Sequence, residues 1–159
     1  MSWRPAPRWI LSPIAGSSFK PDAKNLHGAL DLMEEKTAAW RNKLRKGHAI
    51  GFSCHESFDT GVACDACAVD VSIEDKRPKI RRVTVAVDPG LAVKPLTIES
   101  QFQAGVAFGV SKLMAKGAIT LKESYVEQSN FDTYTPPYII DAPVAVAVHI
   151  VPSTEKPSG

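Results

Sequence analysis

The cysteines are the residues of this chain whose type and spacing could most directly do chemistry. Cys64 and Cys67 form a Cys-x-x-Cys pair, which could hold a metal ion or cycle between dithiol and disulfide. On a strand, residues three apart point to opposite faces. The chain has no second cysteine pair and no histidine at the spacing of a zinc site. We therefore expect these two cysteines to serve packing or a local bulge, with no metal and no mutual disulfide.

Other polar residues are each weaker candidates for a site. Cys54 and His55 are adjacent, so only one of them can face a given pocket if both lie on a strand. His149 stands in an apolar run, where a satisfied core or edge histidine is the usual case. Asp88 precedes Pro89-Gly90 and could be a turn former, although strand ends also border pockets. None of these residues alone names a reaction.

Length and composition limit what the chain can be. Its 159 residues, 44% of them hydrophobic, are enough for one domain with a real core and few for two. The 19 basic and 17 acidic side chains nearly balance, which argues against a nucleic-acid-binding face. No apolar run reaches the roughly 20 residues of a membrane-spanning helix. Three cysteines without a disulfide framework favour a reducing compartment, and we expect a cytoplasmic protein, with the periplasm as the alternative.

The elements that must position these residues follow from periodicity. An apolar stripe predicts a first helix, which Asp22 can cap and Gly47 can end; it consists of Leu26, Leu30, Met33, Thr37, Trp40 and Leu44. Strand-like patterns follow at residues 48–58, 61–73 and 79–88, the last two joined by a charged turn that predicts an antiparallel hairpin. A second helix is predicted from Thr97 to Met114, with Gly117 ending it.

The rest of the chain completes an α+β pattern. A short strand pair is predicted around residues 118–121 and 124–128, followed by a proline-marked loop and a β-branched strand within 144–152. We predict a single α+β domain, with two main helices packed on a mostly antiparallel sheet. Residues 1–21, interrupted by prolines, are expected to form an irregular N-terminal arm, and residues 22–159 the domain.

The second predicted helix carries an unusual combination of residues. Gly105 and Gly109 stand four apart inside it, and each glycine costs a helix about 1 kcal/mol relative to alanine. Gln101 and Gln103 lie near its start. A close-packed helix with surface glutamines would explain the glycines, but it would not explain where Gln101 stands relative to Pro95 and Asp88.

The order of several segments resembles the C-terminal part of the large subunit of molybdenum hydroxylases, the xanthine dehydrogenase and aldehyde oxidase family. The similarity is greatest to the branch of isoquinoline 1-oxidoreductase β-subunit-like proteins. In that family a strand ends in Ala-Val-Asp-x-Gly, a proline follows, and six residues later a glutamine heads a glycine-containing helix. The matching residues here are Ala86, Val87, Asp88, Gly90, Pro95 and Gln101.

The resemblance implies a role for the second helix. Gln101 and Gly105 would be cofactor-binding residues, and Gln101 would contact the molybdenum cofactor, because a carboxamide offers both donors and acceptors to a pterin. Gly105 and Gly109 would let the helix backbone pack closely against its surroundings. The implied cofactor is molybdopterin, as a cytosine dinucleotide. The implied reaction is hydroxylation of an aldehyde or N-heteroaromatic carbon with water as the oxygen source.

The resemblance also implies partners and an incomplete chain. The family continues beyond the last strand to a Gly-Glu whose glutamate is the general base, whereas this sequence stops at Gly159. We therefore expect a piece of the large subunit that is inactive alone and encodes no catalytic residue of its own. Its partners would be the missing part of the large subunit and an iron–sulfur small subunit, and it could form a homo-oligomer. The alternative is a non-catalytic module that stands alone or binds a partner without cofactor.

Overall fold

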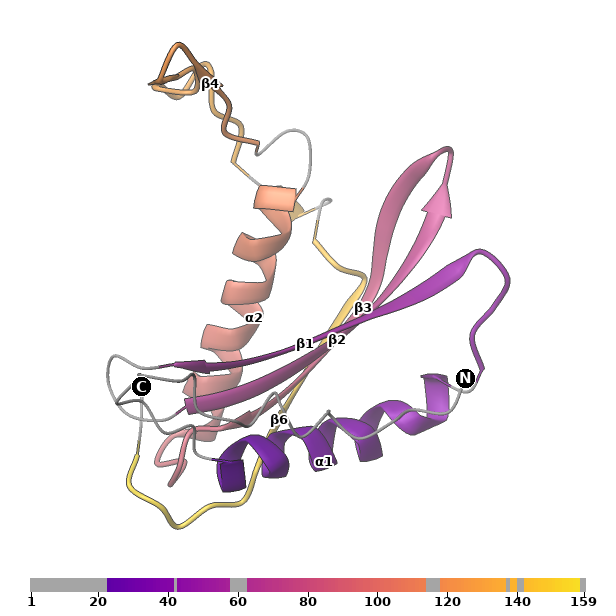
Figure 1. The fold of residues 1–159 in the computed structure, drawn as a ribbon, viewed down its shortest axis with the longest axis vertical. Helices are drawn as coiled ribbons and strands as arrows, with labels where there is room; N and C mark the ends of the chain where they lie inside the picture. Colours follow the sequence, from indigo (N-terminus) through magenta and orange to yellow (C-terminus); the bar gives the residue numbers. More distant parts are fainter. Residues whose placement is uncertain are drawn as a thin grey trace, which may run out of the picture.

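The computed structural model describes residues 23–41, 43–57, 63–113, 118–136, 138–139 and 142–157. Two helices and six strands follow one another in these ranges, as Figure 1 shows. They are α1 (Ala23–Arg41), β1 (His48–Ser57), β2 (Ala63–Glu74), β3 (Arg77–Asp88), α2 (Pro95–Leu113), β4 (Leu121–Lys122), β5 (Tyr125–Val126) and β6 (Ala145–Ile150). This is the predicted α+β domain of two helices on a mostly antiparallel sheet.

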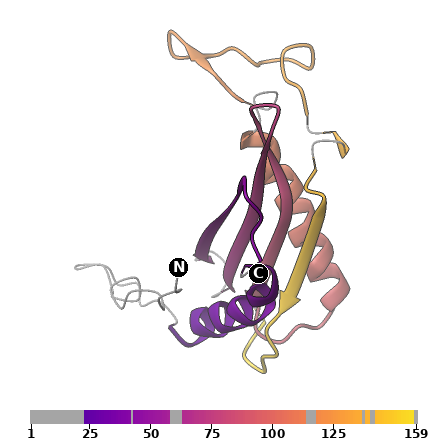
Figure 2. The ribbon, with the colours of Figure 1, turned by 90° about the vertical axis from the view of Figure 1, so that its right-hand side faces the viewer.

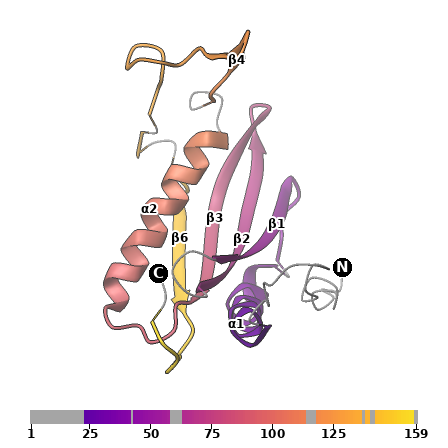
Figure 3. The same cartoon turned by 60° about the vertical axis from the view of Figure 1, so that its left-hand side comes forward.

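The main sheet has the strand order β1-β2-β3-β6. β1, β2 and β3 pair antiparallel, and β6 joins β3 in parallel (Figure 3). Asp75 and Lys76, both with positive φ, make the turn of the predicted hairpin between β2 and β3. Such backbone twist matches the twist of the flanking strands. The β-branched run at the end of β3 lies in the middle of the sheet and is buried.

One face of the sheet carries the core together with α1. Leu26, Leu30 and Met33 of the helix pack against small side chains of β2 and β3. Those small side chains are Ala66, Ala68 and Ala86. Because they have no bulk, they let the helix approach the sheet closely. At its C-terminal end α1 is held by Trp40, whose ring lies 5.2 Å from the guanidinium of Arg82.

Helix α2 lies on the opposite face of the sheet and runs along β6 (Figures 1 and 3). It buries little of its own surface, since Val110 and Ser111 are its buried residues among those described. Apolar residues of α2 remain exposed, including Leu96 at 77% and Leu113 at 80%. No described helix is long and apolar enough to cross a membrane.

Residues 118–136 form a projecting arm. Its strands β4 and β5 pair with each other through Leu121–Val126 and Lys122–Tyr125. In Figures 1 and 2 the arm stands away from the sheet and from α1. The pairing of β4 with β5 confirms the predicted short strand pair.

Three details of the predicted elements are corrected. Helix α1 ends at Arg41 instead of continuing to Leu44. Gly47, with φ of 85°, therefore belongs to the turn before β1 and does not end the helix. Helix α2 begins two residues before the predicted start, at Pro95, a position where proline's fixed φ suits a helix. The predicted caps Asp22 and Gly117, and the predicted arm of residues 1–21, lie outside the described residues.

Candidate functional site

A groove of about 410 Å³ lies between α2 and the sheet face that α1 leaves free. It is lined by Asp65, Cys67, Val85, Gln101, Phe102, Gly105 and Val106. Both residues that the sequence singled out for cofactor contact, Gln101 and Gly105, are therefore in one cavity. The remaining lining is mostly apolar.

The floor of the groove comes from neighbouring strands in register. Cys67 pairs with Val85, and Asp65 pairs with Val87. Asp65 and Cys67 alternate with Ala66, which faces α1 in the core. Since alternate residues of a strand point to opposite faces, Asp65 and Cys67 share the face toward α2.

The wall of the groove is one side of α2. Gln101 and Gly105 are four residues apart, as are Phe102 and Val106. Residues at this spacing lie above one another on the same side of a helix. Gln101 stands in the second turn of α2, so its carboxamide is near the N-terminal end of the groove wall.

Asp65 is the one carboxylate among the groove's lining residues. Its Oδ1 lies 3.6 Å from Nδ1 of His55 on the neighbouring strand β1. Burial raises the pKa of the Asp65 carboxyl, and the nearby His55 opposes that rise. The groove therefore contains an acid that holds its proton more strongly than an exposed aspartate does.

Cys67 is a half-buried thiol beside this acid. Burial, and secondarily the Asp65 carboxylate, raise the pKa of the Cys67 thiol to about 11. A thiol of this kind is almost entirely protonated at neutral pH, and it is the thiolate that attacks electrophiles or binds metals. Cys67 is thus a packing residue of the floor.

The two glycines of α2 have no close neighbour among the described residues. A Cβ built at Gly105 or at Gly109 would meet no atom within 4 Å outside the local helix. Nothing described in the chain therefore presses on these positions. Close packing against other parts of a larger enzyme stays a prediction, and at Gly105 the missing side chain leaves the groove open.

Asp88 and Gly90 form a buried turn after β3, away from the groove lining. Asp88 is 4% exposed and accepts a hydrogen bond of 3.0 Å from the Gly90 amide. This is the turn-forming role considered for Asp88. Gly90 has φ of 72°, and a Cβ there would meet the carbonyl group of Lys156. The Leu91 amide donates a hydrogen bond of 2.9 Å to the Glu155 carbonyl, so this turn holds the segment after β6 against the end of β3.

The remaining cysteines and histidines lie elsewhere. Cys64 and Cys67 both lie in β2, so they are strand residues as predicted. The irregularity in the pairing of β2 lies between Asp70 and Val71, so the cysteines do not form a bulge. Cys67 and Cys54 are free thiols. Cys54 packs against the α1 core, and burial raises its pKa. Within the described ranges no three His, Cys, Asp or Glu side chains come together as metal ligands.

His149 lies on the core side of the sheet. Its register partner in β3 is Ala86, which packs in the core with α1. Burial, and then the charge of Lys36 on α1, lower the pKa of the His149 imidazole. It is a half-buried histidine of β6 and not part of the groove.

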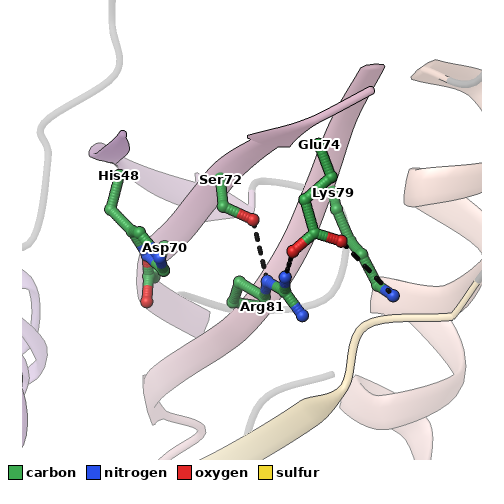
Figure 4. Close-up of polar contacts among 6 residues, drawn as sticks. All are labelled: His48, Asp70, Ser72, Glu74, Lys79 and Arg81. Carbon is green, nitrogen blue, oxygen red and sulfur yellow. Dashed lines mark hydrogen bonds and ion pairs between the residues drawn. The ribbon is translucent and has the colours of Figure 1, made fainter. Parts of the chain in front are cut away.

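A second polar cluster, drawn in Figure 4, lies toward the hairpin turn between β2 and β3. His48 Nδ1 and Asp70 Oδ1 are 2.9 Å apart. The Arg81 Nε donates to the Ser72 hydroxyl at 2.8 Å, and the same guanidinium pairs with Glu74. These contacts join adjacent strands, so the cluster stabilises the long hairpin.

A groove between a helix and a sheet, with one carboxamide and one acid in an apolar lining, is the kind of cavity in which proteins bind ligands. Comparison with known families shows to which family the chain belongs. Residues 23–143 match the model of the molybdopterin cofactor-binding domain, so the chain belongs to that family. This membership confirms the resemblance to the molybdenum hydroxylases. No curated protein matches the chain.

Solved structures that are similar to part of the chain include two oxidoreductases. Quinoline 2-oxidoreductase from Pseudomonas putida 86 is 15% identical, with a TM-score of 0.47 over 60% of this chain and 12% of that one. A CO dehydrogenase from Oligotropha carboxidovorans is 22% identical, with a TM-score of 0.42 over 58% of this chain and 12% of that one. The matched part of the chain thus covers about an eighth of the length of these proteins.

Several groove residues were not found from the sequence. Asp65 was not considered, and Cys67 was considered only as half of a cysteine pair. The alternation of β2 could have placed both on one face, but no sequence pattern shows which helix covers that face. Phe102 and Val106 follow from the helical spacing once Gln101 and Gly105 are taken as the groove side of α2.

Proposed function

We propose that the groove between α2 and the sheet forms part of a molybdopterin site, with Gln101 as a cofactor contact and Gly105 as the position that lets the ligand reach the helix backbone. The observation that carries the proposal is that Gln101 and Gly105 line one groove in a member of the molybdopterin-binding family. Residues 22–159 would be this domain, preceded by the arm of residues 1–21.

The groove's chemistry fits such a group. The Gln101 carboxamide can donate to and accept from the polar edge of a pterin. Phe102, Val106 and Val85 offer apolar surface to a flat ring system. Gly105 has open space in front of it. The family resemblance favours the cytosine dinucleotide form of the cofactor.

When bound, the cofactor would supply the redox chemistry, and the chain would bind and orient it. The proposed reaction of the complete enzyme is hydroxylation of an aldehyde or N-heteroaromatic carbon with water as the oxygen source, in the manner of the isoquinoline 1-oxidoreductase branch. Its partners would be the rest of the large subunit and an iron–sulfur small subunit, and its location the cytoplasm.

We expect the isolated chain to bind the cofactor weakly and to show no turnover. The groove is bounded on one side by α2 and on the other by the sheet, and its single carboxylate, Asp65, pairs with His55. General-base assistance contributes about 10²- to 10⁴-fold and needs a carboxylate within reach of the reacting oxygen. Binding of the cofactor without turnover would therefore distinguish the isolated domain from the complete enzyme.

Exposed apolar surface favours a second candidate function, a partner-binding module without cofactor. Phe131 on the projecting arm is fully exposed, at 103%, and Ile139 is 94% exposed. Apolar surface of this kind marks interaction sites. Retention of a partner in the absence of any pterin would favour this candidate.

A binding measurement with matched variants tests the cofactor proposal. Molybdenum cofactor released from a purified molybdoenzyme is added to the full chain, and retained pterin is measured by fluorescence after dialysis. Gln101→Ala should reduce retention about tenfold, the effect of losing roughly 1.4 kcal/mol of hydrogen bonding. Gln103→Ala is the control, because Gln103 is an exposed glutamine of the same helix outside the groove lining. Equal retention by both variants would refute the assignment of Gln101.

A further inference from the structure

Strand β1 is an edge of the main sheet. It pairs with β2 on one side, and no described strand pairs with its other side. All ten residues from His48 to Ser57 keep a regular register with β2. Figure 3 shows β1 on the far side of β2 from β3, β6 and α2. An edge of this length presents a row of backbone donors and acceptors to solvent.

Within the described part of the chain, several features that usually protect an edge are missing from β1. It contains no proline, lysine or arginine, and its pairing shows no bulge. At its centre Phe52 is 48% exposed, between Gly51 and Ser53. The other edge differs, because β6 has only six residues, lies along α2 and ends just before Val151 and Pro152.

We propose that β1 pairs with β1 of a second copy of this chain, antiparallel about a two-fold axis at Phe52, so that the two sheets become continuous. A two-fold axis presents the same strand to itself, and a strand pairs with itself only if no like charges face each other. With the axis at Phe52, the two phenylalanines meet, and Ile50 faces Cys54 of the second copy. His48, which pairs with Asp70 of its own chain, then stands opposite Glu56 of the second copy, so that no acid faces an acid.

The composition of the strand supports a second copy over an unrelated partner. Glu56 is the single acid of β1, and the self-paired register places it away from its own equivalent. The residues of the other face near the axis, Gly51 and Ser53, are small and face each other. On this face of the sheet, therefore, no bulky side chains crowd each other at the axis. The dimer axis lies at β1, whereas the groove is bounded by α2, so each copy keeps its own groove.

Sedimentation equilibrium of the purified full chain from about 1 µM to about 100 µM tests the proposal, a range suited to a small interface. The wild-type chain should show a reversible monomer–dimer equilibrium within it. Phe52→Lys should weaken dimerisation by about tenfold or more, because a lysine on an edge strand opposes pairing. Phe108→Lys is the control, since Phe108 is similarly exposed, at 56%, on α2, and it should leave the equilibrium unchanged. Circular dichroism shows whether each variant is folded.

A crosslinking variant tests the register itself. Phe52→Cys should form a disulfide-linked dimer under mild oxidation, because the axis brings the two copies of position 52 together, whereas Phe108→Cys should not exceed the wild-type chain. A chain that stays monomeric at every concentration would overturn the proposal. So would assembly that Phe108→Lys weakens and Phe52→Lys does not, or crosslinking that is no greater for Phe52→Cys than for Phe108→Cys. Cofactor binding is independent of these outcomes.

Discussion

The carboxylate of Asp65 on β2 lies 3.6 Å from the imidazole of His55 on β1, where it forms the polar end of an otherwise apolar groove floor. His55 itself does not line the groove. It therefore acts on the groove through Asp65, and its effect on the pKa of Asp65 can be measured directly.

The first prediction concerns the effect of Asp65 on stability. Burial raises the pKa of Asp65 in the folded state, so the folded chain binds this proton more strongly than the unfolded chain. Stability then falls as pH rises from the ordinary aspartate value of 3.8 through the raised pKa. Asp65→Asn should remove this part of the pH dependence, so its stability relative to wild type should be greater at pH 7 than at pH 3. Urea unfolding at both pH values measures it, and a difference of opposite sign would contradict the prediction.

The contact between Asp65 and His55 also predicts a change in the pKa of Asp65 that NMR can measure. His55 lowers the pKa of Asp65 against the larger effect of burial. His55→Gln should therefore raise the pKa of Asp65 further. The carboxyl carbon shift of Asp65 during a pH titration reports it, and an unchanged or lower pKa would show that His55 does not act on this acid.

A second prediction concerns the reactivity of Cys67. Its pKa of about 11 leaves little thiolate at pH 8, so alkylation in the folded chain should be much slower than after unfolding. Asp65→Asn removes one cause of the raised pKa and should speed the reaction. Asp70→Asn is the control, since Asp70 contacts His48 instead. Mass spectrometry after timed iodoacetamide treatment measures the rates, and rapid alkylation of Cys67 in the wild-type chain would contradict the prediction.

A third prediction compares two glycines with positive φ. Gly90→Ala should cost about 2–4 kcal/mol, because strain in the backbone adds to a collision with the Lys156 carbonyl group. Gly47→Ala should cost only about 1 kcal/mol, since alanine is strained at a φ of 85° but its Cβ would meet no atom within 4 Å. Urea midpoints of the two variants measure the difference. Equal losses would mean that the segment after β6 does not press on Gly90.

The glycines of α2 give a fourth prediction with the opposite sign. Gly105→Ala and Gly109→Ala should each stabilise the chain by about 0.5–1 kcal/mol, because alanine is the better helix former and both positions have open space. Thermal unfolding measures the gain. If Gly105 matters for ligand approach, a bulky Gly105→Leu should reduce pterin retention, whereas Gly109→Leu should not. Loss of stability on either alanine substitution would indicate a contact that the fold of this chain does not contain.

The cluster of Figure 4 gives the fifth prediction. Arg81→Met should cost about 1–2 kcal/mol, because it removes the hydrogen bond to the Ser72 hydroxyl, which is 4% exposed. Lys79→Met should cost less than about 0.5 kcal/mol, since its 3.9 Å pair with Glu74 is exposed. Chemical denaturation of the two variants gives the comparison. A larger loss for Lys79→Met would reverse the assigned order.

Local patterns in the sequence were enough to predict the elements of the fold. The spacing of Leu26, Leu30 and Met33 predicts α1, and the turn residues after β2 predict its hairpin with β3, because helix and strand periodicities are local properties of the chain. The end of α1 was harder to predict. Leu44 continues the apolar spacing, yet the chain turns away after Arg41 so that β1 can begin at His48.

The resemblance carried by the sequence order placed Gln101 and Gly105 together, and spacing alone puts them on one side of α2. What only the tertiary structure decided is what faces them. Asp65, Cys67 and Val85 complete the groove because α2 lies across the face of the sheet that α1 leaves free, and no local pattern specifies which face a distant helix covers. The same is true of Asp88, which belongs to the same family pattern as Gln101. Its carboxylate bonds to the Gly90 amide and is buried in a turn, since a nearby backbone donor satisfies a buried acid that would otherwise lack a partner.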